Sequence, residues 1–282
     1  MSLKKHKLAL AIAAAAGMTF SAGAFATNGI MQAGNGMVAH GLGGAGLSNA
    51  GEAMSGFDNP ALISQTGDSL SLGFSMFSPD RSVSQPGVIT EGDSDATMFA
   101  IPQIAFTSKL NDAMSWGIMV NAMGGMNTDY RSGPNLGAPT PLFANPQSVD
   151  LSGMMIAPTM SFALNKDLSL GASLLIGYEN FRVRNLFGQG VTNEGSTLAY
   201  GVKLGADWKI TDGISVGGML QPRMSADEFA FFKTQLAGFG FTGDSALVLP
   251  NQLGVGGKFA VGKSVDIVAD LMWYQWSGVD VF

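Results

Sequence analysis

The chain has 282 residues, of which 13% are charged, and a formal net charge of −6 at pH 7. The negative charge argues against nucleic acid as a partner, and the lack of cysteine excludes a disulfide framework, a thiolate metal site and a cysteine nucleophile. A mean hydropathy of +0.23 is typical neither of an ordinary soluble domain nor of a disordered chain. Past the N-terminus, however, no run of roughly 18 apolar residues predicts a membrane helix.

Residues 1–26 have the three parts of a secretory signal peptide. Three lysines form a basic start, Leu8–Phe20 is almost wholly apolar, and Ala24-Phe25-Ala26 supplies a small-x-small cleavage site. We therefore expect the mature chain to begin at Thr27. An uncleaved membrane anchor is the alternative, but the apolar run is shorter than the roughly 20 residues that span a bilayer.

A glycine-rich segment follows, and residues 41–46 fit G-x-G-x-x-G, the pattern of a dinucleotide-binding turn. That pattern needs a hydrophobic strand before it, and Asn35–His40 is not one. Export also removes the chain from the cytoplasmic nucleotides. We therefore expect no nucleotide, and we interpret the glycines as letting backbone pack closely in a confined space.

Apolar residues alternate with small or polar ones in about nine later segments, each of the length that a tilted membrane strand needs. A transmembrane strand shows this pattern because one face meets lipid and the other the lumen. A soluble sandwich also alternates, so each segment alone leaves both folds open. The segments are Leu70–Met76, Met98–Phe106, Met114–Val120, Met154–Leu164, Leu168–Tyr178, Tyr200–Ile210, Ile214–Leu220, Leu253–Val261 and Val265–Trp273.

The connections between the segments favour the membrane fold. Tight turns alternate strictly with long segments, as in outer-membrane barrels with short periplasmic turns and long outer loops. The predicted long loops are Pro79–Ala96, Met123–Leu151, Asn180–Ser196 and Pro222–Leu249. Aromatic residues near strand ends suit interfacial girdles, with ordinary core packing as the alternative: Trp116, Trp208, Trp273, Tyr274 and Trp276.

The predicted fold is all-β, a transmembrane antiparallel up-and-down β-barrel with an N-terminal hatch, or plug. Bacterial barrels normally have an even number of strands, and nine would leave two open edges. Unpaired backbone groups in lipid cost several kcal/mol each. We therefore expect the chain to be incomplete, or to close by assembly with a partner.

The glycine-rich segment resembles the hatch of the FadL family, the outer-membrane transporters of long-chain fatty acids and hydrocarbons. The resemblance rests on Thr27-Asn28-Gly29, Gly34-x-Gly36, Ala39–Gly46 and Asn59-Pro60-Ala61-Leu62. Further matches are Trp116–Gly125 with Tyr130, which resembles the family's third strand and its kink, Leu249-Pro250, and Ala269-Asp270-x-x-Trp273-x-x-Trp276-Ser277. The resemblance covers most of residues 27–277. Family members usually have about fourteen strands, so this chain departs from them by lacking the last third.

The resemblance implies a domain organisation and a mechanism. Residues 1–26 would be the signal peptide, 27–66 the hatch and 67–282 the incomplete barrel of a protein in the outer membrane of a Gram-negative bacterium. A hydrophobic ligand would settle on a groove in the outer loops, pass into the lumen and leave sideways through a gap at the kinked third strand. No energy source is needed, because the ligand moves between apolar environments worth about 0.8 kcal/mol per buried CH₂.

The candidate site residues follow this route. For the hatch we select Asn59, Pro60 and Ala61, where an ordinary turn is the alternative. For the lateral gap we select Gly124 and Gly125, since glycine within a strand marks a bend or bulge; a plain strand end is the alternative.

Two further sets would contact the ligand itself. Apolar residues in the long loops predict the outer groove: Leu136, Leu142, Phe143, Phe229, Phe232 and Leu236. A carboxylate head group would need a cation, for which ordinary solvated charges are the alternative: Arg182, Arg184, Lys203 and Arg223.

Catalysis has little support. His40 is the only histidine after the predicted signal peptide, so neither a metal cluster nor a Ser/His pair outside the hatch can be assembled. We expect no enzyme activity, no cofactor and no metal. The expected partners are outer-membrane lipid and a hydrophobic small molecule, with a monomer if the chain is full length. A general diffusion porin, a surface adhesin on the same barrel and a nonfunctional fragment remain the alternatives.

Overall fold

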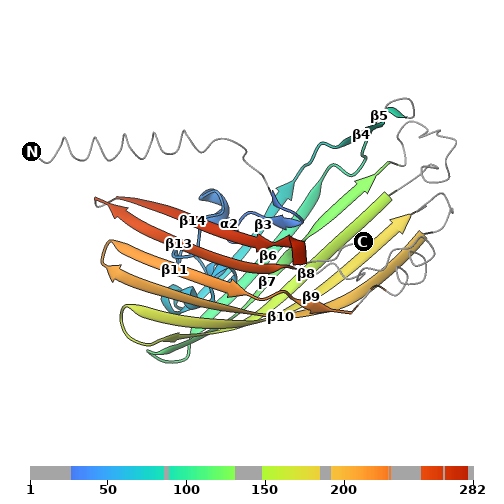
Figure 1. The fold of residues 1–282 in the computed structure, drawn as a ribbon. Coiled ribbons are helices and arrows are strands. Elements are labelled where there is room, and N and C mark those ends of the chain that lie inside the picture. The colour runs from blue at the N-terminus through green and yellow to red at the C-terminus, as the bar shows by residue number, and fades with distance from the viewer. Residues whose placement is uncertain are drawn as a thin grey trace, which may run out of the picture.

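One antiparallel sheet dominates the computed structural model, which describes residues 27–85, 89–130, 148–184, 192–227, 229, 249–262 and 264–278. Within these residues each of nine strands pairs with its neighbour in sequence, so the sheet is a simple meander (Figure 1). The strands are β3 (Ser69–Phe77), β6 (Phe99–Lys109), β7 (Met114–Asp129), β8 (Ser148–Ala163), β9 (Leu168–Arg184), β10 (Thr192–Thr211), β11 (Ile214–Gln221), β13 (Asn251–Val261) and β14 (Val265–Gln275). Each predicted segment falls on one of them, which confirms the fold class.

The remaining described elements are short. A β1 (Thr27–Asn28) and β2 (Met31–Gln32) hairpin begins the N-terminal segment, followed by α2 (Gly36–Gly41), α3 (Ser55–Asp58), η1 (Pro60–Leu62) and α4 (Ile63–Thr66). Two further strands, β4 (Ser82–Gln85) and β5 (Ile89–Asp93), form a hairpin, β12 (Ser225–Ala226) pairs with β10, and η5 (Trp276–Gly278) follows β14. Among the described residues, no helix combines the length and the apolar character that crossing a membrane requires. The predicted signal peptide, residues 1–26, lies outside them.

The N-terminal segment lies against the concave side of the sheet (Figure 1). Its η1 turn contacts β8, β9 and β10, and α4 contacts β6, β7 and β8. Residues 27–66, which the sequence predicts as a hatch, are called the hatch below. Strands β3 and β14 end the meander, and the described residues show no pairing between them.

The two faces of the sheet differ in the way a membrane strand requires. On β9, Leu174 points outward and is 49% exposed, whereas its neighbour Ser173 points inward and is 3% exposed. The outer face is thus apolar and uncovered, and the inner face is small and buried. A soluble sandwich has the opposite arrangement, with its apolar face packed inside.

Two predicted loops are shorter than expected, because the strands continue into them. The β9–β10 ladder runs to Arg184 opposite Thr192, inside the predicted loop Asn180–Ser196, and the β7–β8 ladder runs to Asp129 opposite Ser148. Beyond the apolar belt neither face of a strand needs to be apolar, so the period-two signal ends while the backbone pairing persists. The predicted loop Pro79–Ala96 holds the β4–β5 hairpin.

Glycines on the inner face make room for the hatch. A Cβ atom at Gly171 would overlap the backbone of Pro60 and Ala61, one at Gly205 would overlap the Asn59 side chain, and one at Gly217 would overlap the Leu47 carbonyl. These three glycines come from β9, β10 and β11. The hatch can therefore touch the wall backbone to backbone.

We predict that Gly171→Ala displaces the hatch. The added methyl group has no space beside Pro60, and such overpacking typically costs about 1–3 kcal/mol. The free energy of unfolding should fall by that amount in a urea titration, and residues 46–66 should become more accessible to protease. Gly218→Ala is the matched control, because its Cβ would meet only the Gly254 oxygen, at 3.5 Å. Equal stability of the two variants would contradict the close packing.

We also predict that Leu174→Arg destabilises the protein in a bilayer. An arginine on the lipid face costs about 2–4 kcal/mol near the membrane midplane. Urea titration of the protein folded into phosphatidylcholine vesicles measures this loss. Leu174→Met should change the free energy of unfolding by less than about 1.5 kcal/mol. An equally small change for Leu174→Arg would show that this face does not meet lipid.

Candidate functional site

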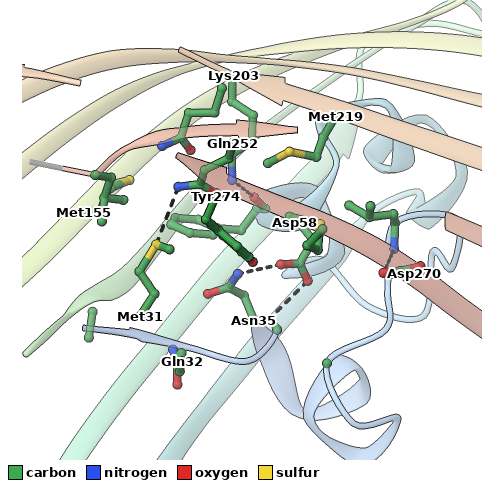
Figure 2. A pocket seen from close by; sticks show the side chains of 18 residues that line it. Met31, Gln32, Asn35, Asp58, Met155, Lys203, Met219, Gln252, Asp270 and Tyr274 are labelled. Carbon is green, nitrogen blue, oxygen red and sulfur yellow. Dashed lines mark hydrogen bonds between the residues drawn. The ribbon is translucent and has the colours of Figure 1, made fainter. Parts of the chain in front are cut away.

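A cavity of about 70 Å³ lies between the hatch and the inner face of the sheet (Figure 2). Four methionines are among the residues that line it. Methionine suits a surface that adapts to apolar ligands of different shape. The hatch contributes Met31, Asn35, Phe57 and Asp58, and the wall contributes Met155, Lys203, Met219, Gln221, Gln252, Met272 and Tyr274.

Lys203 is the cation in this cavity. Its side chain comes from β10, is 4% exposed, and donates a 2.6 Å hydrogen bond from Nζ to the Phe57 carbonyl oxygen. The same Nζ lies 4.9 Å from the centre of the Phe57 ring. Lys203 therefore ties the wall to the hatch. An ammonium group has three donors, so this bond leaves capacity for an acceptor on a ligand.

Asp58 is the hatch carboxyl group that faces the same cavity. It accepts hydrogen bonds from Asn35 at 2.5 Å (Nδ2 to Oδ1) and 3.3 Å (backbone N to Oδ2). Burial raises the pKa of Asp58 to about 6; the Asn35 hydrogen bonds and the Lys203 charge oppose that shift, whereas the Asp270 charge adds to it. Asn35 also accepts a hydrogen bond from Asn121 on β7. A polar chain thus runs from Asp58 through Asn35 to the wall.

Strand β7 has a bulge at the position where the sequence predicts a kink. The register with β8 shifts between Ala122 and Gly124, and Gly124 has a φ of +127°, which other residues rarely adopt. The hatch hairpin docks on this bulge, because Gly125 donates a 3.1 Å hydrogen bond from its backbone N to the Ile30 oxygen. A Cβ at Gly124 would overlap the same carbonyl group.

The later part of the hatch has more polar anchors. On β10, Asp207 accepts hydrogen bonds from Ser48 (2.6 Å) and Gln65 (2.7 Å). On β14, Asp270 Oδ2 accepts from the backbone N of Gly46 (2.7 Å) and of Leu47 (3.0 Å). We call residues 46–66 the anchored part of the hatch and residues 27–35 the hatch hairpin.

The predicted hatch residues lie at the centre of the anchored part. Asn59 donates from Nδ2 to the Leu47 oxygen at 2.7 Å and to the Ala206 oxygen at 3.0 Å, and its Oδ1 accepts from the Ala61 N at 3.1 Å. Ser161 on β8 donates to the Ala61 oxygen at 3.0 Å. Pro60 begins η1 between them.

The structure does not gather the four predicted head-group cations at one place. Lys203 lies in the cavity opposite Ser173, whereas Arg182 lies further along β9, is 44% exposed and forms a 3.0 Å ion pair with Glu194. Arg184 ends β9. Arg223 follows β11, and its backbone N donates to the Asn251 side chain at 2.7 Å. The head-group role therefore stays a prediction, with Lys203 the best placed.

Of the six predicted groove residues only Phe229 is described. It is buried with its ring centre 5.7 Å from that of Phe181, in a group called the loop-side cluster: Leu151, Phe181, Val183 and Phe229. A second apolar group, the hatch-side cluster, includes Met31, Phe57, Met119, Met155, Leu175, Met224 and Leu249. The predicted residues Leu136, Leu142, Phe143, Phe232 and Leu236 lie outside the described residues.

Sequence reasoning missed the polar residues that join the hatch to the wall. Asn121 and Asp207 occupy inward positions of alternating strands, so an unexpected polar residue in an inward row was the available signal. Nothing in the sequence pairs them with Asn35 and Ser48, which lie far away along the chain.

Comparison with known proteins places the chain in a family. The model of the "Outer membrane protein transport protein (OMPP1/FadL/TodX)" family matches residues 12–282. No curated protein sequence matches significantly.

Solved structures share the fold. The P. putida toluene transporter TodX superimposes with a TM-score of 0.68 at 18% identity, covering 88% of this chain and 72% of that one. The Ralstonia pickettii toluene transporter TbuX gives 0.67 at 18%, covering 87% and 73%, and a Pseudomonas aeruginosa FadL homologue gives 0.57 at 15%, covering 86% and 69%. The family match extends over nearly the whole sequence, and we conclude that this chain belongs to the OMPP1/FadL/TodX family of outer-membrane transport proteins.

Proposed function

We propose that the protein mediates passive uptake of hydrophobic molecules, such as long-chain fatty acids or hydrocarbons, across the outer membrane. The family is one of transport proteins and not of enzymes, and solved proteins with this fold are described as toluene transporters. The observation that carries the proposal is the docking of the hatch hairpin on the β7 bulge, between the Ile30 carbonyl and Gly125.

Apolar side chains mark a route through the protein. The loop-side cluster lies where β8 begins and β9 ends, and the hatch-side cluster lies against the hatch. Ile30 packs against both clusters and also touches the bulge. A ligand that moved from one cluster to the next would reach the hairpin, and displacement of the hairpin would open a way out beside Gly124 and Gly125. The ligand stays in apolar surroundings throughout, so no energy source is required.

The contacts indicate which part of the hatch moves. The anchored part has hydrogen bonds to β8 through Ser161, to β10 through Asn59 and Asp207, and to β14 through Asp270. The hatch hairpin is held to β7 by Gly125, by Gln32 to Asn121 at 3.2 Å, and by Asn35 to Asn121. In our proposal these β7 contacts break during transport, and the anchored part stays in place.

Crosslinking the hairpin to β7 should therefore block uptake. The side chains of Asn35 and Asn121 are in direct contact, and the chain has no cysteine of its own. We expect the oxidised Asn35→Cys/Asn121→Cys variant to lose most of its uptake of labelled toluene or oleate into proteoliposomes, and to regain it on reduction.

A second crosslink supplies the control. The hydroxyl group of Ser48, in the anchored part, lies 2.8 Å from that of Ser215 on β11. Ser48→Cys/Ser215→Cys should therefore form a disulfide without reducing uptake. Full transport by the oxidised Asn35/Asn121 variant would contradict the proposed exit. Swelling of the same liposomes by sugars, without uptake of either hydrophobic probe, would favour a diffusion porin instead.

Asp58 should make stability depend on pH. Its pKa is about 6 in the folded state against 3.8 for an ordinary aspartate, so between these values the folded protein holds more protons than the unfolded chain. Stability conferred by Asp58 is then complete below 3.8 and is lost as the pH rises through about 6. We expect Asp58→Asn to remove this component, since an amide does not titrate. Urea titrations across that pH range check it, and parallel curves for variant and wild type would be evidence against it.

A further inference from the structure

Glu179 on β9 has a buried carboxyl group that the proposed function does not use. Its exposure is 1%, and within the described parts of the chain neither carboxyl oxygen has a hydrogen-bond partner. A buried polar group without a partner costs free energy, which a donor brought by a ligand would recover. Such a group on an apolar route is therefore a candidate contact for cargo.

The strand register places Glu179 between the two apolar clusters. Leu175 of the hatch-side cluster and Phe181 of the loop-side cluster belong to the same inward row of β9 and lie on either side of Glu179. On the neighbouring strands Glu179 faces Gly153 and Thr197. Both neighbours are small and carry no charge.

The hydroxyl group opposite Glu179 and two of the cations on β9 and β10 are engaged elsewhere. Thr197 donates its hydroxyl hydrogen to the Asp227 carbonyl oxygen at 2.8 Å. Arg182 pairs with Glu194 on the outer side of the sheet, and Lys203 donates to Phe57 in the hatch. The carboxyl group of Glu179 is thus left without a partner at an inward position of β9, between the two apolar clusters. A carboxyl group accepts a hydrogen bond in either protonation state, and it also donates one when it is protonated.

We propose that Glu179 is a specificity-determining residue that accepts a hydrogen bond from cargo as it passes between the clusters. The preferred substrates are hydrophobic molecules with a hydroxyl or amino donor, such as fatty alcohols or phenols. Bare hydrocarbons leave Glu179 without a partner. This inference rests on the proposed function and narrows its substrate class.

Matched ligands test the proposal on the full chain. Binding of 1-dodecanol, dodecane and laurate to the protein in liposomes is measured against empty liposomes, together with uptake. For the wild type we expect 1-dodecanol to bind about tenfold more tightly than dodecane, the order expected for pairing one buried polar group. Glu179→Met should abolish this preference, and Glu179→Gln should keep part of it, because an amide oxygen also accepts.

Two comparisons separate a specific effect from a structural one. Glu179→Met replaces an unpartnered polar group by an apolar one of similar size, so its urea midpoint should be equal to or above that of the wild type. Ser173→Ala removes a hydroxyl group lower in the same inward row, where Ser173 bonds to Thr159 at 2.7 Å, and should leave the ligand preference unchanged.

An unchanged ratio of 1-dodecanol to dodecane in Glu179→Met would overturn the inference while leaving the proposed function in place. A preference for 1-dodecanol that is lost in Lys203→Met and kept in Glu179→Met would also overturn it and would support the head-group role of Lys203. If the wild type took up none of the three ligands, the proposed function itself would fail.

Discussion

The structure depends on close contact between the backbone of the hatch and the inner face of the sheet. Side chains on that face are small where the hatch turns, because Gly171, Gly205 and Gly217 face Pro60, Asn59 and Leu47. Backbone groups buried there need partners, and Asn59 supplies them by bonding Leu47 within the hatch and Ala206 on β10. Without the glycines the turn could not reach the wall, and without Asn59 two buried carbonyl groups would lose a donor.

That contact is uneven along the hatch, and in the proposed function this difference separates a part that stays in place from a part that is released. Carboxylates on β10 and β14 hold the anchored part through charge-assisted hydrogen bonds. The hairpin instead meets a bulged strand through amide and backbone groups. A bulge interrupts the ladder of β7, so the wall is already irregular at the place where the hairpin rests. In the proposed function, the hairpin can thus leave β7 while the anchored part stays against the sheet.

Three ionisable side chains on the inner side of the sheet have distinct environments. Lys203 joins the wall to the hatch, Asp58 is linked to Asn35, and Glu179 lies between two apolar clusters without a partner. An apolar passage selects cargo mainly by size and hydrophobicity, and this distinguishes weakly between similar molecules. A single buried group that must be paired discriminates more strongly, because the wrong cargo leaves it unsatisfied. We therefore place the recognition of cargo chemistry, in our proposal, at Glu179 and not along the apolar clusters.

The sequence by itself determined the strands and their order along the sheet. Two environments on opposite faces impose a period of two on every membrane strand, as in Leu174 beside Ser173, and a turn motif such as Asn59-Pro60-Ala61 is local. It could not give the ends of β9 and β10, because the apolar residues no longer point outward there: on β9, Phe181 and Val183 point inward while Arg182 points outward, and the start of β10 is polar. Only the tertiary structure decided which distant polar residues meet, such as Asn35 with Asn121 or Ser48 with Asp207. Those pairs depend on strand register and on the path of the hatch, and neither leaves a local pattern along the chain.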